Sequence, residues 1–591
     1  MKLFYSHELI INWLHSKLSS KQFLMLSSVL VGLTAGLTAV LLKTLVHYIH
    51  LAIVYNYHFS FQYYLYLIFP LVGILLTVYS VKQFLNGKLG KGTANILHSI
   101  VRKSAFLPKD QMYSHVLTSA ITVGLGGSAG LESPIVTTGS AIGSNYSKTY
   151  HLPYKDRVLL LACGASAGIA AAFNSPIAGV LFALEVLLVE VTISAFLPLI
   201  IAAAIGTLCS KIILKEDFLL SFNLQEPFDF HNVPFYMILG VLTGMVSVYY
   251  SRMFVRVGKL FGQNKQKVYQ KAIIGGLLLA LLIFLFPPLF GEGYESIKVL
   301  SGNNARELLN KSILSKYAAS DWFVLFFIGA VMLVKVIAAS ITINSGGNGG
   351  NFAPSLFVGA YLGYFFSYLI NLTGISTLPL SNFAIVAMAG ILTGVFHAPL
   401  TGIFLIAEIT GGYELMVPLM IVSAISYLVV KYFEPLSMDE KILLRKGHVI
   451  THSKDKTILS SLQMDKIIEN DFQKVKPEAT LKELTEVVAR STRNIFPIVN
   501  SENQLVGIIY LDMIREIMFK SELYETVLVE QLMKNAPTQV SQGENMHSVM
   551  KKFDNTGLWN LPVVEDGQYV GFVSKSSLLT KYRSRLIRTS D

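Results

Sequence analysis

Long, nearly uncharged apolar runs constrain the fold of this chain more than any other feature of its sequence. An α-helix needs about 20 apolar residues to cross the roughly 30 Å hydrocarbon core of a bilayer, and each run reaches or approaches that length. Only 14% of the residues are charged, compared with about 25% in soluble globular proteins. The chain is therefore predicted to be a polytopic membrane protein. The runs cover residues 23–46, 63–81, 177–208, 272–286, 323–343 and 403–430.

Charge and cysteine content argue against several other classes. The formal net charge is +11, but in a membrane protein an excess of Lys and Arg typically marks cytoplasmic loops, so nucleic-acid binding is not expected. The only cysteines, Cys163 and Cys209, lie in apolar segments, and neither a disulfide framework nor a metal site is expected. The first apolar run is too long for a signal-peptide core and is predicted to remain as the first helix.

A change of composition predicts two domains. Residues 1–446 are apolar with Gly-rich interruptions, whereas residues 447–591 contain charged amphipathic stretches and short β-branched runs. The boundary, Arg445-Lys446-Gly447, is basic, as expected where a helix leaves the membrane on the cytoplasmic side. The first domain is expected to carry the membrane function and the second to be a cytoplasmic tail.

The membrane part contains an internal repeat. The segment 174–185 and the segment 397–408 share Pro, Gly and Glu at one offset, and 134–139 matches 354–359 at nearly the same offset. Matched Gly- and Pro-interrupted apolar segments in two halves are typical of transporters built from repeats. The halves are predicted at about 22–215 and 233–446.

Two glycine-rich interruptions, at 124–134 and 345–354, are predicted to break the membrane helices. Each Gly costs a helix about 1 kcal/mol relative to Ala, and the prolines at 134 and 354 suit the first turn of a new helix. Irregular backbone within a bilayer requires burial in protein or a wet cavity. Two helix N-termini converging there would bind an anion with unpaired N–H groups and partial positive charge. The alternative is that the glycines only permit close helix packing.

Glu132 lies at the first of these interruptions. A carboxylate within the membrane is costly, and such residues are usually functional. Among helix N-termini, its side chain would compete with a free anion and act as a gate. The alternative role for Glu132 is an ordinary acidic residue at a helix N-terminus.

The ordered set of these motifs resembles the CLC family of chloride channels and transporters. Residues 130–134 are similar to its GxEGP-like gating motif, residues 349–354 to its GxFxP motif, and residues 291–294 to a loop between its halves. The resemblance implies an all-α membrane domain of about eighteen helices in an inverted repeat, and a homodimer with one anion pathway per subunit. It also implies that Glu132 is the gate. The implied anion-binding residues are Gly130, Leu131, Ser133, Asn351, Phe352 and Ala353.

Two departures from the family's pattern affect the inner mouth. The family's Gly-Ser-Gly-Ile-Pro motif is replaced here by Gly90-Lys91-Gly92-Thr93-Ala94, and its central tyrosine aligns with Asp439. A neutral hydroxyl pair would thus become a Lys91–Asp439 pair, which would change anion selectivity. The alternative is that Lys91 faces cytoplasmic water.

A third departure concerns protons. Exchangers of the family commonly carry a second glutamate as an internal proton relay, and Val186 occupies that position here. Because a valine cannot carry a proton, Val186 favours a chloride channel over a Cl⁻/H⁺ antiporter, which is the alternative.

The tail contains a second repeat. Residues 495–499 and 505–509 match 560–564 and 569–573, each pair being two short β-branched runs with a polar turn between them. They resemble two CBS motifs, at about 464–520 and 528–585, which implies an α/β module. Such modules often bind adenine nucleotides, for which Asp512 and Ser577 are the candidates, although a dimerising and coupling role without nucleotide is the alternative.

Other functions fit the sequence less well. No nucleophile elbow, phosphate loop or metal cluster indicates an enzyme. A cation-coupled carrier would need carboxylates or carbonyls directed at a cation rather than helix N-termini, and a nucleotide sensor without transport leaves the paired interruptions unexplained. Chloride, with or without protons, is the expected ligand and no cofactor is required. The expected location is a bacterial inner membrane, with the C-terminus in the cytoplasm.

Overall fold

Two units of different secondary structure make up the chain, Met1–Ile450 and Thr451–Asp591. The computed structural model describes residues 18–590 except 55–61, 86, 88, 91, 103, 189–192, 215–226, 264–267, 303, 311, 412, 446–461 and 463. The predicted domain boundary at residues 446 and 447 lies outside the described residues.

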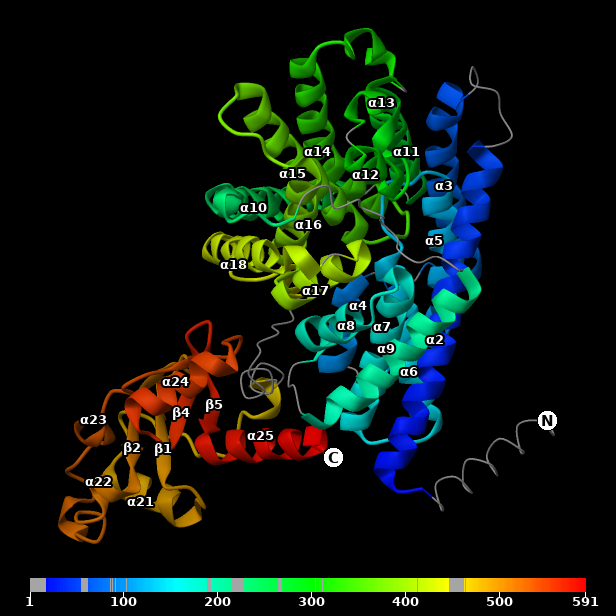
Figure 1. Cartoon of the computed structure of the whole chain (residues 1–591). Helices are drawn as coiled ribbons and strands as arrows, with labels where there is room; N and C mark the ends of the chain where they lie inside the picture. The colour runs from blue at the N-terminus through cyan, green and yellow to red at the C-terminus, as the bar shows by residue number, and fades with distance from the viewer. Residues whose placement is uncertain are drawn as a thin grey trace. The chain divides into compact units, whose positions relative to one another are not determined.

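The first unit is entirely helical within the described residues, which confirms the predicted all-α class (Figure 1). It contains nine helical segments that are long and apolar enough to cross a membrane, counted over the described residues. Its α-helices are α2 (Ser20–Val54), α3 (Gln62–Phe84), α4 (Gly92–Arg102), α5 (Ser114–Gly124), α6 (Glu132–Thr149), α7 (Tyr154–Phe173), α8 (Pro176–Phe182), α9 (Ile193–Leu214), α10 (Val233–Gln263), α11 (Val268–Leu285), α12 (Tyr294–Ser301), α13 (Ala305–Asn310), α14 (Asp321–Asn344), α15 (Phe352–Thr373), α16 (Leu380–Phe396), α17 (Pro399–Thr410), α18 (Met416–Phe433) and α19 (Met438–Arg445).

Two of the apolar runs that the sequence presents as continuous are broken in the structure. In the first half, α8 ends at Phe182 and a single π-helical turn covers Ala183–Leu187 before α9 begins. In the second half, α17 ends at Thr410 because Gly411 takes the left-handed conformation that terminates helices (φ +65°). The breaks follow the repeated Pro-Gly-Glu motif in both halves, so each half contains a short helix that hydropathy alone does not separate.

Small residues bring α6 and α7 into backbone contact. A Cβ atom built on Gly139 would lie 2.1 Å from the carbonyl oxygen of Gly164, and one built on Gly164 would lie 1.9 Å from that of Gly139. The matching pair in the second half, α15 and α16, is equally close, because a Cβ on Gly363 would lie 2.1 Å from the carbonyl oxygen of Phe383. These helices form the frame that holds the N-termini of α6 and α15.

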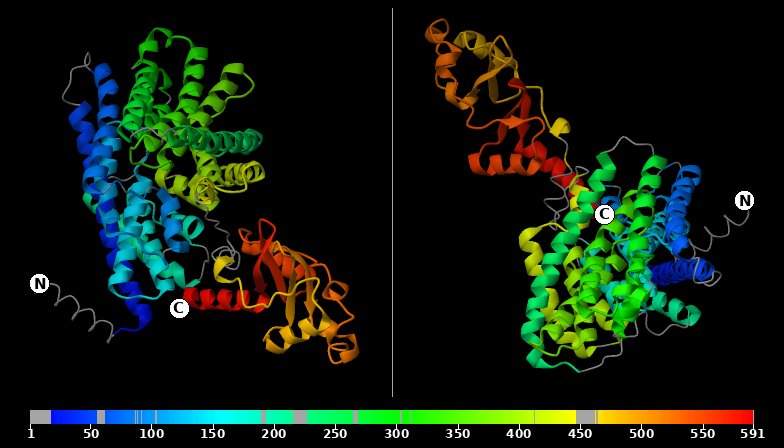
Figure 2. Two further views of the ribbon diagram at one scale, coloured as in Figure 1. Left: turned by 180° about the vertical axis from the view of Figure 1, so that it is seen from behind. Right: turned by 90° about the horizontal axis from the view of Figure 1, so that it is seen from above.

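The second unit combines helices and small sheets, as predicted for a pair of CBS motifs (Figure 2). Strands β1 and β2 form an antiparallel pair, while β4 pairs with β3 in parallel and with β5 antiparallel. Its elements are α21 (Leu481–Arg490), β1 (Ile495–Val499), β2 (Leu505–Tyr510), α22 (Leu511–Ile514), α23 (Val529–Leu532), β3 (Val540–Ser541), α24 (Met546–Thr556), β4 (Asn560–Glu565), β5 (Gln568–Ser574) and α25 (Lys575–Ser590).

The two motifs of the second unit pack against each other. Residues of the first motif, Phe472 and Ile508, share an apolar cluster with Tyr569 and Phe572 of the second. The backbones of Glu469 and Phe572 exchange two hydrogen bonds of 2.8 and 3.0 Å. The repeated strands therefore form one module rather than two separate ones.

Candidate functional site

The two glycine-rich interruptions meet in the first unit, as the sequence predicts. Gly130 and Gly350 exchange two backbone hydrogen bonds, of 2.9 Å and 2.8 Å. Helix α6 begins two residues after Gly130 and α15 begins two residues after Gly350. Side chains are excluded at this crossing, since a Cβ atom on Gly350 would lie only 2.4 Å from the Cβ of Ser133. The N-termini of two long helices from different halves are thus held together by a short backbone bridge.

Glu132 lies at this meeting point and is almost fully buried, with 3% of its surface exposed. One carboxylate oxygen accepts a 2.7 Å hydrogen bond from the hydroxyl of Tyr294, and the other accepts from the amide of Ala353 at 3.3 Å. Glu132 belongs to α6 but its carboxylate lies on the first turn of α15. A negative group therefore occupies the helix N-terminus at which an anion would be stabilised.

The connection between α11 and α12, together with the first residue of α12, supplies two further polar side chains to this point. Glu292 accepts a 3.2 Å hydrogen bond from the amide of Leu131, and Tyr294 is the donor to Glu132. The fully buried Lys335 supports the loop from α14, donating to the carbonyl of Gly291 at 3.1 Å. Sequence reasoning gave none of these three residues a role. The signals that could have identified them were the Gly-Glu-Gly-Tyr loop and a lysine within an apolar run.

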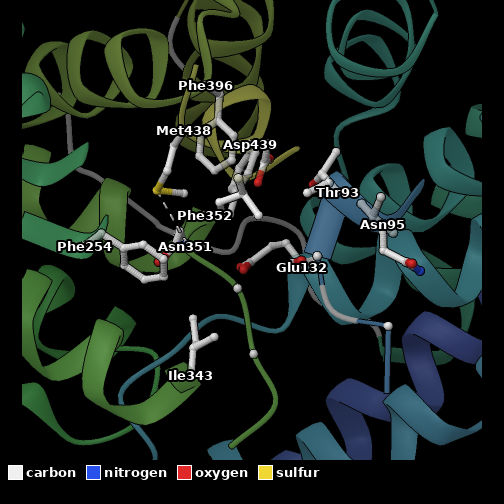
Figure 3. Close-up of a pocket in the computed structure, with 18 of the residues that line it drawn as sticks. Thr93, Asn95, Glu132, Phe254, Ile343, Asn351, Phe352, Phe396, Met438 and Asp439 are labelled. Atoms are coloured by element: carbon white, nitrogen blue, oxygen red, sulfur yellow. Dashed lines mark hydrogen bonds between the residues drawn. The ribbon is translucent and has the colours of Figure 1, made fainter. Parts of the chain in front are cut away.

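A cavity of about 430 Å³ opens beside the crossing (Figure 3). Five of the predicted site residues contribute to its wall: Glu132, Ser133, Asn351, Phe352 and Asp439. The other described residues that line it are Leu89, Gly90, Gly92, Thr93, Ala94, Asn95, Val136, Ile169, Phe182, Phe254, Ile343, Asn344, Gly349, Gly350, Phe396, Met438 and Ile442. The cavity combines helix N-termini and hydroxyl and amide groups with apolar side chains.

Three other predicted anion-binding residues do not line the cavity. The amides of Gly130, Leu131 and Ala353 donate to Gly350, Glu292 and Glu132 respectively. None of the three is among the residues that line the cavity. In this conformation their amides are therefore occupied by the protein itself.

The remaining predicted positions lie elsewhere. Val186 is in the π-helical turn, partly buried against the core and outside the cavity lining. Lys91 lies outside the described residues, so the predicted Lys91–Asp439 pair has no structural description. Thr93, from the start of α4, lines the cavity together with Asp439. Thr93 escaped the sequence reasoning because the expected hydroxyl position was the one that Lys91 occupies.

The repeated glutamates connect the two halves reciprocally. Glu185, from the first half, accepts hydrogen bonds from the amides of Leu400 (3.0 Å) and Thr401 (2.7 Å) at the start of α17. Glu408, from the second half, accepts from the amides of Ile177 (3.1 Å) and Ala178 (2.9 Å) at the start of α8. Each carboxylate thus caps the N-terminus of the matching helix in the other half. These glutamates tie the repeats together and are separate from the cavity.

The two nucleotide candidates in the tail make local contacts. Asp512 is exposed and forms an ion pair with Arg515 one helical turn away. The amide of Ser577 donates to the hydroxyl of Ser574 at 3.1 Å. Nucleotide binding at either residue stays a prediction.

Comparison with known proteins identifies the class. Residues 73–431 match the voltage gated chloride channel family, and residues 464–520 and 529–584 each match the CBS domain. The chain therefore belongs to the voltage-gated chloride channel family and carries a CBS pair on its C-terminal tail.

Curated relatives agree with this assignment. A ClcB-like chloride channel protein of Ralstonia nicotianae is 28% identical over 371 residues, which are 61% of this chain and 81% of that protein. The H(+)/Cl(-) exchange transporter ClcA of Vibrio vulnificus is 30% identical over 314 residues, 51% of this chain and 62% of that protein. Chloride channel protein CLC-e of Arabidopsis thaliana is 29% identical over 379 residues, 59% of this chain and 50% of that protein. The chain thus spans only about half to three fifths of the last two relatives.

Solved structures share the fold. A slow cyanobacterial Cl⁻/H⁺ antiporter superposes with a TM-score of 0.60 at 22% identity, covering 73% of this chain and 99% of that one. A eukaryotic CLC transporter superposes with a TM-score of 0.59 at 18% identity, covering 94% of this chain and 97% of that one. At these identities the likeness establishes the architecture alone.

Proposed function

We propose that this chain transports chloride across a membrane through the cavity of the first unit, with the Glu132 carboxylate as its gate. The observation that carries the proposal is the contact of that carboxylate with the amide of Ala353 at the cavity wall. A tethered carboxylate and a free anion compete for the same helix N-terminus. Movement of Glu132 away from α15 would release the amide and admit chloride.

The donors proposed to hold chloride are neutral. Ser133 and the backbone of Asn351 and Phe352 contribute to the wall, and both α6 and α15 begin there. Partial charges of this kind bind an ion strongly enough to admit it and weakly enough to release it, as conduction requires. Gly130, Leu131 and Ala353 would join this set only when the carboxylates of Glu132 and Glu292 leave their amides.

We infer that transport is coupled to protons. Relatives named H(+)/Cl(-) exchange transporters support this mode, as does the use of a carboxylate, a group that can carry a proton, as the gate. Passive conduction is the second candidate, and Val186 at the position of the family's internal glutamate favours it. We further propose a homodimer with one cavity per subunit in a bacterial inner membrane, with the CBS pair in the cytoplasm.

The gate is tested by chloride efflux from liposomes that contain the purified protein. Glu132→Gln keeps the side-chain volume but removes the charge, so we expect altered chloride efflux and loss of its dependence on pH. Glu295→Gln, a change in the exposed first turn of α12, is the matched control and should behave as wild type. Efflux that is the same in Glu132→Gln and wild type at every pH would remove Glu132 as the gate.

The choice between coupled exchange and passive conduction is tested by the reversal potential under combined chloride and pH gradients. Coupled exchange predicts that the potential shifts when only the pH gradient is changed. A potential that follows the chloride gradient alone would establish the channel mode. Single-molecule photobleaching of labelled protein in liposomes, with two steps expected, tests the homodimer.

A further inference from the structure

Two carboxylates from distant parts of the chain line the cavity. Glu132 enters from the start of α6 and Asp439 from the start of α19, 307 positions later in the numbering, and Figure 3 shows both at the cavity. Among the described lining residues, no other side chain can gain or lose a proton in the physiological pH range.

Asp439 is not needed to cap its own helix. The start of α19 is already capped by Glu440, which accepts a 2.7 Å hydrogen bond from the amide of Ser437, while the amide of Glu440 donates to the hydroxyl of Ser437 at 3.4 Å. This reciprocal pair is a capping box. Asp439 instead contributes to the cavity wall, as does Thr93 of α4.

Several charged residues lie on or near the helix of Asp439. Helix α19 also carries Glu440, Lys441 and Arg445, of which Lys441 is paired with Glu434, and Glu132 is the other acid of the cavity. Helix α4 presents Thr93, while its titratable residues, His98 and Arg102, lie more than one turn further along. Helix α16, which also packs against α19, has no titratable residue. Lys91, which precedes α4, lies outside the described residues.

An ionised Asp439 and a chloride ion in the same cavity repel each other, because the low dielectric constant of a protein interior strengthens like-charge repulsion. Protonation of Asp439 removes that repulsion. Chloride entry therefore favours a proton on Asp439, and a proton on Asp439 favours chloride entry, by reciprocal linkage.

The alternative carboxylate near Val186 is engaged elsewhere. Glu185 is bound by the backbone amides of Leu400 and Thr401 as the cap of α17, and neither Glu185 nor Val186 lines the cavity. Asp439 is therefore the described carboxylate that shares the cavity with Glu132.

We propose that Asp439 is the inner proton acceptor of this transporter and that protons and chloride use the same cavity. The Asp439 carboxylate takes a proton from water that enters the cavity from one side of the membrane and passes it through cavity water to the carboxylate of Glu132. Asp439 returns to its ionised form in that step, and Glu132 releases the proton to the opposite side. This inference rests on the proposed chloride transport and specifies how protons are coupled to it.

The test measures chloride efflux and proton movement together in the same liposomes. Asp439→Asn should reduce the ratio of chloride-driven proton movement to chloride efflux by about tenfold or more, since a general acid–base group is lost. Chloride efflux itself is expected to persist at a changed rate, because the variant removes a charge from the cavity wall. Asp439→Glu should restore proton movement. Asp156→Asn, the same change in the first turn of α7 outside the cavity, is the matched control and should leave both fluxes unchanged.

The outcomes separate the inference from the proposed function. Absence of chloride efflux in the wild type would refute chloride transport itself. Chloride efflux with proton movement that survives in Asp439→Asn would overturn the role of Asp439 alone. Chloride efflux without proton movement in the wild type would overturn the proposed proton coupling together with it.

A second measurement does not depend on the folding of an Asp439 variant. The Glu132→Gln variant in detergent should still take up protons when chloride is added, because Asp439 remains. A pH-sensitive dye in the solution measures this uptake. Absence of that uptake would also overturn the inference.

Discussion

The hydrogen bond from Tyr294 to Glu132 is expected to hold the gate closed. It is a 2.7 Å contact between a hydroxyl and a buried carboxylate, and hydrogen bonds to charged groups contribute about 1.5–3 kcal/mol. Tyr294→Phe removes this contact and leaves the Ala353 amide, at 3.3 Å, as the other described donor to that carboxylate. Since 1.4 kcal/mol corresponds to a factor of ten, the equilibrium between closed and open gate should shift toward open by about 10- to 150-fold.

Chloride efflux from liposomes measures this shift. We expect faster efflux from Tyr294→Phe than from wild type when the gate limits the rate. Tyr249→Phe is the control, because that hydroxyl also loses one hydrogen bond, a 3.0 Å contact with the carbonyl of Leu333. Neither residue of that pair lines the cavity.

A double-mutant comparison decides whether the effect passes through Glu132. In a Glu132→Gln background the charged acceptor is gone, so Tyr294→Phe should add little, and the two changes should be strongly non-additive. Equal effects of Tyr294→Phe in both backgrounds, or efflux unchanged in the single variant, would refute the idea that this hydroxyl holds the gate.

Three further predictions concern the frame around the site and the tail. Gly350→Ala should destabilise the protein by about 1–3 kcal/mol or more through overpacking, because its Cβ would lie 2.4 Å from the Cβ of Ser133. Gly302→Ala is the control, since its Cβ would have no neighbour closer than 3.6 Å. Thermal unfolding in detergent compares the two variants, and equal stability would contradict the close crossing. Glu408→Gln should cost about 1–2 kcal/mol by weakening two amide caps, seen as faster hydrogen exchange at the start of α8, and unchanged exchange there would argue against the cap. Burial alone would raise the pKa of Glu544, but hydrogen bonds, chiefly from a lysine side chain, lower it below 4.5. The ionised Glu544 therefore stabilises the tail by up to about 1 kcal/mol above that pH, and this stabilisation is lost on acidification. Glu544→Gln should increase the rate of hydrogen exchange in the tail near pH 7, and the rates of variant and wild type should become equal in acid. A difference in rate that persists in acid would contradict this assignment.

Local sequence signals determined the broad architecture. Long apolar runs require membrane helices, and a run of several glycines followed by proline favours a break and a new helix start, so the starts of α6 and α15 could be predicted near Glu132 and Phe352. The β-branched runs of the tail likewise identify its strands. These features depend on the conformational preferences of neighbouring residues, which the sequence displays directly.

Contacts across the halves could not be predicted in this way. The amide of Ala353 lies 221 positions from Glu132, and Tyr294 comes from a third segment, so their meeting depends on how the repeats pack. The reciprocal caps made by Glu185 and Glu408 arise for the same reason. Residue type determines that a helix N-terminus attracts a carboxylate, but only the tertiary structure decides which carboxylate reaches it, because that depends on the summed packing of many distant side chains.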